Sequence, residues 1–293
     1  DTFAVNTAGR LGAVTNNNDG TFTYSPAGAF ETLSAGQTAT DTFSYTVTDA
    51  AGAASTATVT ITITGQNDAP VALAVTGSVG EDGPAATVSA SFTDADGANT
   101  HTFAVNTTGL QGGVTNNNDG TFTYDPAQAF QSLAAGQSAT ETFSYTVTDS
   151  SGASSQNTIT ITINGANDAP DAVDDVASTA EDTAVIIDVL ANDTDVDAGA
   201  TKTITHIDGQ LATVGTPVVL SSGGTATLSP DGKISYAPAA NANGAKTFSY
   251  TLSDGSLSDT ASVTVTVGGS NDAPVGPAAG ALADGVEDVA YVV

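Results

Sequence analysis

The sequence is 293 residues long and carries 32 acidic but only 4 basic side chains, so its formal net charge is -28. This imbalance excludes a nucleic-acid-binding protein, because almost no cations are available to neutralise phosphates, and it disfavours binding to an anionic membrane surface. Hydrophobic residues make up 40% of the chain, too many for a disordered acidic tail. Cysteine is absent, which excludes disulfides, zinc–thiolate sites and thiol nucleophiles.

The ends of the chain say little about cellular location. No apolar run approaches the roughly 18 residues that a bilayer-spanning helix needs. The chain has no initiator Met and begins inside a repeat. We therefore expect a piece of a longer protein, and the lack of a signal peptide carries no information.

A long internal repeat organises the sequence. Residues 1–70 align without a gap onto 101–170, with 50 of the 70 positions identical, and the tetrapeptide Asn-Asp-Ala-Pro closes both segments. It returns a third time at 271–274. We predict four parts, namely a first repeat that lacks its N-terminal portion (1–69), a complete second repeat (70–169), a diverged third repeat (170–273) and the start of a further one (274–293).

Within each repeat the apolar residues recur with the period of two that is typical of strands. Ile159, Ile161 and Ile163 alternate with threonine, for example, and Asp19-Gly20 is a tight-turn signal between strands. In the second repeat this pattern predicts strands at 71–79, 86–92, 101–106, 113–116, 121–124, 141–148 and 157–164, with one helical turn within 126–135. Seven short strands in about 100 residues favour an all-β, immunoglobulin-like sandwich over a closed barrel.

Several motifs give these repeats a family resemblance. The second repeat carries Gly80-Glu81-Asp82-Gly83 and a closing Asn167-Asp168-Ala169-Pro170, and with the first repeat it resembles the VCBS repeat family. The third repeat carries Ala180-Glu181-Asp182-Thr183 and Tyr250-Thr251-Leu252-Ser253-Asp254-Gly255, and it resembles bacterial cadherin-like repeats. The resemblance implies tandem Ig-like modules of large RTX-type surface adhesins. Such modules are often calcium-dependent and exported by type I secretion.

Strand order in a sandwich predicts where the acidic residues gather, because alternate connections lie at opposite poles. Glu81 follows the first strand and belongs to the C-terminal pole of the second repeat, whereas Asp193 and Asp195 belong to the N-terminal pole of the third. We therefore expect oxygen donors from both repeats to meet at one junction. They are Glu81, Asp82, Asn167, Asp168, Asp193, Asp195, Asp197 and Asp254.

Such a cluster is unfavourable unless a cation binds it, because neighbouring carboxylates repel one another and four basic residues are too few to compensate. Calcium fits better than magnesium, since Ca2+ accepts six to eight oxygen ligands in irregular geometry. The preceding junction is expected to use Asn67, Asp68, Asp94, Asp96 and Asp149, with Asp41 as a further candidate. The alternative is that these side chains only form turns, as Asp and Asn often do.

Catalysis has little support in the sequence. His101 and His206 lie at non-equivalent positions and are expected to be exposed strand residues, and no phosphate-binding loop, nucleophile elbow or zinc motif is present. We therefore do not expect an enzyme. We expect the extender region of a large secreted or cell-surface bacterial adhesin, rigidified by calcium at its junctions and supporting cell adhesion or biofilm formation.

The expected partners are neighbouring repeats of the same chain, with a cell-surface glycan or protein bound through other domains. Neither nucleic acid nor membrane insertion is expected for this part of the chain. Two alternatives stay open. The repeats could themselves form a glycan- or protein-binding module, or they could be spacers in a large secreted hydrolase.

Overall fold

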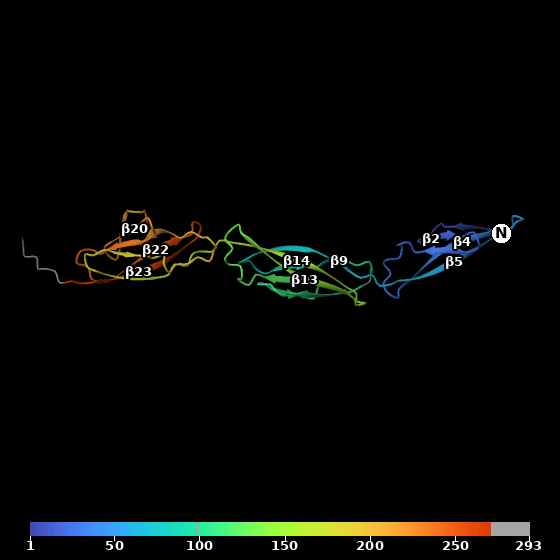
Figure 1. The fold of residues 1–293 in the computed structure, drawn as a ribbon, viewed down its shortest axis with the longest axis horizontal. Coiled ribbons are helices and arrows are strands. Elements are labelled where there is room, and N and C mark those ends of the chain that lie inside the picture. Colours follow the sequence, from blue (N-terminus) through green and yellow to red (C-terminus); the bar gives the residue numbers. More distant parts are fainter. Residues whose placement is uncertain (98, 271–293) are drawn as a thin grey trace, which may run out of the picture. The chain divides into compact units, whose positions relative to one another are not determined.

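The structure is a computed structural model that describes residues 1–97 and 99–270, which form strands, turns and loops (Figure 1). These residues form two compact units, one made of residues 1–168 with 197–199 and the other of 169–196 with 200–270. None of the described residues forms a helix able to cross a membrane. The expected start of a further repeat at 274–293 lies outside the described residues.

The first repeat consists of two small antiparallel sheets. One has the strand order β1-β4-β5 and the other pairs β2 with β3. Their bounds are β1 Thr2–Asn6, β2 Ala13–Asn16, β3 Phe22–Ser25, β4 Thr38–Thr48 and β5 Ala54–Thr64. Within the described residues, β5 forms one edge of its sheet and β3 one edge of the other.

The second repeat is a complete sandwich. Its larger sheet has the order β10-β13-β14-β7, with β7 parallel to β14, and faces the sheet β11-β12-β8, while β6 pairs with β9. The bounds are β6 Val71–Leu73, β7 Val75–Gly80, β8 Ala86–Ser89, β9 Ser91–Thr93, β10 His101–Asn106, β11 Gly113–Asn116, β12 Thr121–Asp125, β13 Ser138–Asp149 and β14 Ser154–Asn164.

The third repeat has the same plan with larger sheets. Their orders are β15-β23-β22-β17-β18 and β16-β21-β20-β19, and β15 runs parallel to β23. The bounds are β15 Asp175–Ala180, β16 Val185–Ile187, β17 Thr203–Ile207, β18 Gln210–Leu211, β19 Pro217–Val219, β20 Thr225–Leu228, β21 Ile234–Ala237, β22 Gly244–Ser253 and β23 Ser258–Gly268.

The structure corrects three details of the predicted second repeat. The expected strands 71–79 and 86–92 are each divided, because their two halves pair with different strands: β6 with β9, β7 with β14, and β8 with β12. The expected helical turn is absent. Residues 126–135 instead form consecutive turns, closed by hydrogen bonds such as that from the Leu133 amide to the Phe130 carbonyl.

The alternating pattern places one face of each strand in the core. In the second repeat Phe122, Tyr124 and Tyr145 are fully buried together with all three isoleucines of β14. The hydroxyl of Tyr145 donates to the carbonyl oxygen of Leu73, 2.6 Å away, and so fixes the first strand to the core. Burial of apolar side chains between two sheets therefore stabilises each complete repeat.

Candidate metal centre

Three acidic residues meet at the C-terminal pole of the second repeat. Glu81, Asp168 and Asp197 each offer a carboxylate oxygen, and these oxygens lie within 4.8 Å of one another. Glu81 is 3% exposed and Asp197 5% exposed. The backbone amide of Asp168 donates to Oδ2 of Asp197 over 3.0 Å, which holds the linker against the loop that carries Asp197.

The end of β7 positions Glu81. Its backbone amide donates to the carbonyl of Asn164 over 3.0 Å, and its Oε1 accepts from the amide of Ala166 over 2.7 Å. Oε2 is buried and has no hydrogen-bond partner among the described residues. Burial raises the pKa of Glu81, and the negative charges of Asp82 and Asp168 raise it further. The hydrogen bond from the Ala166 amide lowers this pKa but does not offset the other effects. A buried carboxylate oxygen among other acids is unfavourable unless a cation accompanies it.

Two other predicted members of this junction have different surroundings. Asp82 is exposed, and its Oδ1 accepts from the Gln131 side-chain amide over 2.7 Å, so the adjacent acids Glu81 and Asp82 face different neighbours. Asn167 is half-buried in the linker and donates through Nδ2 to the carbonyl of Asp168 over 3.0 Å.

Asp193 differs from the expectation that it is a metal ligand. It belongs to the other compact unit, is 3% exposed and accepts from the hydroxyl of Tyr250 at 2.8 and 3.0 Å. The amide of Val173 donates to its Oδ1 over 2.8 Å. Its carboxylate therefore fixes the segment that precedes β15 to the core.

Asp195 and Asp254 belong to the same unit as Asp193. Asp195 is half-buried in the loop after β16. Asp254 accepts from the amide of Leu257 over 2.8 Å and thereby closes its own turn, as the turn-forming alternative predicts.

The junction between the first two repeats has a related arrangement. The amide of Asp68 donates to Oδ2 of Asp96 over 2.9 Å, and this contact matches that between Asp168 and Asp197. Asn67 donates to Oδ2 of Asp149 over 2.7 Å, a bond that lowers the pKa of Asp149. Oδ1 of Asn67 and Oδ1 of Asp96, which is 3% exposed, are buried without a hydrogen-bond partner in the described part of the chain.

Asp94 lies beside Asp96 but has a protein partner that the sequence did not suggest. Its Oδ2 is 2.7 Å from Nε2 of His101. Although burial opposes its charge, hydrogen bonds from His101 and the Asp96 amide hold the pKa of Asp94 below its usual value. The predicted exposure of His101 is therefore wrong, since its side chain is 15% exposed. His206 in β17 is likewise half-buried rather than exposed.

Asp41 is a structural residue with its own hydrogen-bond donors. Its Oδ2 accepts from the amides of Leu11 and Gly12 and from the hydroxyl of Tyr24, and its Oδ1 from the amide of Thr42. These donors, Gly12 first, lower the pKa of Asp41 despite desolvation. With so many donors already directed at its oxygens, Asp41 does not fit as a metal ligand.

Glu141 forms the same clamp in the second repeat. Its Oε1 accepts from the amide of Gln111, and its Oε2 from the amide of Gly112 and the hydroxyl of Tyr124. A Cβ on Gly112 would lie 2.4 Å from the Tyr124 hydroxyl oxygen, so only glycine allows this approach. Asp41 and Glu141 occupy equivalent positions in the aligned segments 1–70 and 101–170, but the sequence alone did not indicate this role.

A half-buried acid of the third repeat was also missed. Asp175 stands near Asp193 and Tyr250, and burial followed by the charge of Asp193 raises its pKa to about 6. The folded state therefore binds a proton more tightly than the unfolded chain, and the stability that this proton contributes is lost as pH rises from about 4 to about 6.

We expect Asp175→Asn to stabilise the third repeat above pH 6 and to leave it unchanged at pH 3.5, where the native carboxyl is neutral. The full pKa shift of Asp175 corresponds to about 3 kcal/mol of unfolding free energy. Because solvent screens this half-exposed carboxyl group, we expect the variant to gain only about 1–2 kcal/mol. Urea unfolding in chelator at pH 3.5 and 7.5 measures the difference. A variant that is less stable than the wild type at pH 7.5 would contradict this assignment.

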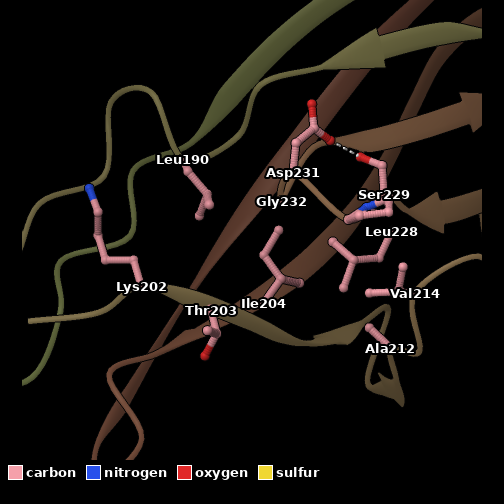
Figure 2. A pocket seen from close by; sticks show the side chains of 11 residues that line it. Leu190, Lys202, Thr203, Ile204, Ala212, Val214, Leu228, Ser229, Asp231 and Gly232 are labelled. Atoms are coloured by element: carbon pink, nitrogen blue, oxygen red, sulfur yellow. Dashed lines mark hydrogen bonds between the residues drawn. The ribbon is translucent and has the colours of Figure 1, made fainter.

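The third repeat also has a surface pocket of about 470 Å³ (Figure 2). Leu190, Ile204 and Leu228 form its apolar lining, with Lys202 at one side and Asp231 at another. None of its eleven lining residues is aromatic. Lys202 already donates to the carbonyl of Asp193, so its charge contributes to the loop structure. The pocket therefore has no stacking surface for a sugar.

The sheets and their pairing define the class of protein, a tandem array of all-β, Ig-like repeats. The sequence profile of the bacterial cadherin-like domain matches residues 1–65, 67–165 and 167–269. The chain belongs to the bacterial cadherin-like domain family and contains three tandem copies of it. No curated protein sequence matches the chain significantly.

Solved structures with similar folds are cadherin extracellular domains. Mouse Cadherin-23 EC22-24 is 15% identical with a TM-score of 0.52, covering 91% of this chain and 85% of that one. Mouse clustered PcdhgC3 EC1-3 is 15% identical with a TM-score of 0.51, covering 90% and 88%. Protocadherin Gamma B2 domains 1-5 is 19% identical with a TM-score of 0.50. The match covers 92% of this chain but only 53% of the protocadherin chain, and at these identities the likeness concerns the fold alone.

Proposed function

We propose that these repeats are a non-catalytic extender in a large secreted or cell-surface bacterial adhesin, and that calcium bound at their junctions stiffens them. The observation that carries this proposal is the meeting of Glu81, Asp168 and Asp197, in which the buried Oε2 of Glu81 has no hydrogen-bond partner within residues 1–97 and 99–270. Three tandem matches to the bacterial cadherin-like domain support it, because an array of such repeats suits a stalk that contacts mainly its own neighbouring repeats.

The donor set suits a hard divalent cation. Only oxygen atoms are offered, so metals that prefer sulfur or imidazole ligands are disfavoured. Three carboxylates that bind in bidentate fashion can supply six oxygens, within the range of six to eight that calcium takes at 2.3–2.6 Å. Magnesium requires a near-ideal octahedron and keeps its waters, which suits a mostly buried set less well. Glu81, Asp168 and Asp197 are the proposed first ligands, and Asn167 is a neighbouring donor.

The first junction is the second proposed site. Asp96 and Asn67 each present a buried oxygen without a hydrogen-bond partner in the described part of the chain, and Asp68 is held against Asp96 as Asp168 is held against Asp197. Asp149 and Asp94 are already engaged by Asn67 and His101. We assign them the role of orienting this junction.

The charge explains how such an extender would work. Without a cation, the acidic side chains at each junction repel one another. The chain has a net charge of -28 and only four basic side chains to compensate for it. In a cytoplasm with little calcium the repeats would be less stable, and this suits a type I system that exports the chain in an unfolded state. Outside the cell, millimolar calcium would bind only the folded junctions and stabilise them by mass action. Stiffened repeats would then hold a distal adhesive domain away from the surface and so support adhesion or biofilm formation.

Small-angle scattering tests the stiffening directly. We expect the full chain to show less flexibility in 2 mM calcium than in chelator, and Asp197→Asn to remove part of this change. Asp231→Asn is the matched control, because Asp231 is exposed and bonded to Ser229 within its own turn. Equal scattering in chelator and calcium would refute stiffening by calcium.

A further inference from the structure

The second repeat has a surface cavity lined by aromatic rings. Its volume is about 450 Å³, within the range of about 300–1,000 Å³ that small-molecule sites occupy. Phe92, His101 and Phe103 contribute rings to its lining, and the turn between β11 and β12 contributes residues 119–121. All of these residues belong to one repeat and to one compact unit. The cavity is therefore formed within a single repeat.

The three rings are inclined to one another rather than stacked. The ring centroids of Phe92 and His101 are 4.6 Å apart with 57° between the ring planes, and those of Phe92 and Phe103 are 5.7 Å apart at 61°. His101 and Phe103 share one face of β10, because they are two residues apart in that strand, whereas Phe92 comes from β9. Rings inclined in this way suit a small, rounded group better than the flat face of a sugar.

The turn between β11 and β12 is fixed against these rings. A Cβ on Gly120 would lie 3.1 Å from Cζ of Phe103, so the backbone of the turn lies close to that ring. Gly120 has a φ of 90°, a conformation that glycine adopts without strain. Its carbonyl accepts from the amide of Ala90 over 2.7 Å, which joins the turn to the segment between β8 and β9. The lining of the cavity is therefore held in place by the fold itself.

The same turn places a negative charge at the cavity. Asp119 is exposed, and its Oδ1 accepts from the Thr121 hydroxyl over 2.6 Å and from the Thr121 amide over 2.9 Å. The bond from the hydroxyl, followed by the bond from the amide, lowers the pKa of Asp119. Its carboxylate is therefore ionised at neutral pH and is held in one orientation.

The charge of the whole repeat favours a cationic ligand. Residues 70–169 contain nine acidic side chains and neither lysine nor arginine. Nε2 of His101 lies 2.7 Å from Oδ2 of Asp94, so a positive charge on this imidazole would be balanced within the pair. A surface of this kind repels anions and attracts cations. The electron-rich faces of aromatic rings attract the same class of ligand.

The third repeat has a cavity at the corresponding turn, with different chemistry. Its β20–β21 turn carries Asp231-Gly232, as the β11–β12 turn carries Asp119-Gly120. Leu190 and Ile204 line that cavity where the second repeat has rings, and Lys202 adds a positive charge (Figure 2). The third repeat therefore provides a control for the second within the same chain.

We propose that the cavity of the second repeat binds a quaternary ammonium group, such as that of choline, against the rings of Phe92, His101 and Phe103. Asp119 supplies the counter-charge. Such a group is cationic but has methyl groups on its surface, so aromatic rings hold it without needing hydrogen bonds to it. A repeat of the extender would then bind a ligand of its own. This assignment does not depend on the proposed calcium sites.

NMR titration of the full chain with choline chloride, in chelator, tests the site apart from calcium. We expect saturable shifts of the amide signals of Phe103 and Gly120, with a dissociation constant on the order of 10⁻³ M. The signals of the third-repeat turn at Asp231-Gly232 should not shift. The neutral isostere 3,3-dimethylbutan-1-ol should bind roughly fivefold or more weakly, because it has the shape of choline without the charge. Equal affinities for the two compounds would overturn the proposal.

Two variants separate the charge from the rings. Asp119→Asn keeps the oxygen that Thr121 binds but loses the charge, and Phe103→Leu loses one ring. Each should weaken choline binding by roughly threefold or more. Asp125→Asn is the matched control, because Asp125 is an exposed acid of the same repeat that accepts from the amide of Ala127 in its own turn. If Asp119→Asn and Phe103→Leu both bind choline as the wild type does, the site is wrongly assigned.

A quaternary ammonium group can reach the cavity from two sources, as a free molecule or as a lipid head group. The choline titration tests the first source, and co-sedimentation with phosphatidylcholine vesicles tests the second. Binding in either experiment supports the proposal, and binding in neither overturns it. Tighter binding of a methyl glucoside than of choline would also overturn it. Loss of calcium binding with retained choline binding would refute only the metal sites.

Discussion

Replacing Glu81 with glutamine is expected to stabilise the chain in chelator and to destabilise it in millimolar calcium. Without metal, glutamine removes a buried negative charge that burial and the neighbouring acids disfavour, as the raised pKa of Glu81 indicates. With metal, the variant lacks a ligand. Calcium at 2 mM is about 2–20 times the dissociation constants of 10⁻⁴–10⁻³ M that are typical of extracellular modules, so it should add about 0.6–1.8 kcal/mol per site to the wild type. A site weakened tenfold in the variant should add well under half of that.

Thermal unfolding of both chains in chelator and in 2 mM calcium measures this reversal. Magnesium at the same concentration is the control for ionic screening, and it should reproduce little of the calcium effect. A variant that is destabilised equally in both media would show that Glu81 has only a structural role.

Truncating Glu141 is expected to have the largest effect that does not depend on metal. Glu141→Ala leaves two backbone amides and the hydroxyl of Tyr124 without their acceptor. Buried donors without partners are costly, so we expect the second repeat to lose about 3 kcal/mol of unfolding free energy. Glu141→Gln, which keeps one acceptor oxygen, should lose less.

Hydrogen exchange of the amides in β11, β12 and β13 locates this loss in the second repeat, since tandem repeats do not unfold as one two-state unit. Thr140→Ala is the control, because Thr140 is an exposed neighbour on the same strand. A loss below about 0.5 kcal/mol in Glu141→Ala would contradict the clamp.

The sequence predicted the fold well because its signals are local and repeated. Alternation of apolar residues identified the strands, and the internal alignment identified the repeats that share this pattern. It did not predict the division of strands at Ala74 and Ala90, because which sheet each half joins depends on pairing between residues far apart in the chain.

The candidate site was predicted less completely. Strand order gives the pole at which a loop lies but not the direction of each side chain. It predicted Glu81 and Asp197 at one junction, and their carboxylates lie within 4.8 Å of each other, but their role as metal ligands stays a prediction. It could not show that Asp193 turns toward Tyr250. The clamp around Asp41 was missed for the same reason, since its donors come from a loop about 30 residues earlier in the chain.

Direct calcium titration by calorimetry tests the central claim most directly. The proposed sites predict binding by the wild-type chain with dissociation constants on the order of 10⁻⁴–10⁻³ M, as in extracellular calcium modules. Glu81→Gln should weaken at least one site tenfold or more. Asp82→Asn should lose much less affinity, because Asp82 is exposed and bonded to Gln131 and acts on Glu81 only through its charge. Absence of calcium binding, or equal losses in both variants, would contradict the account.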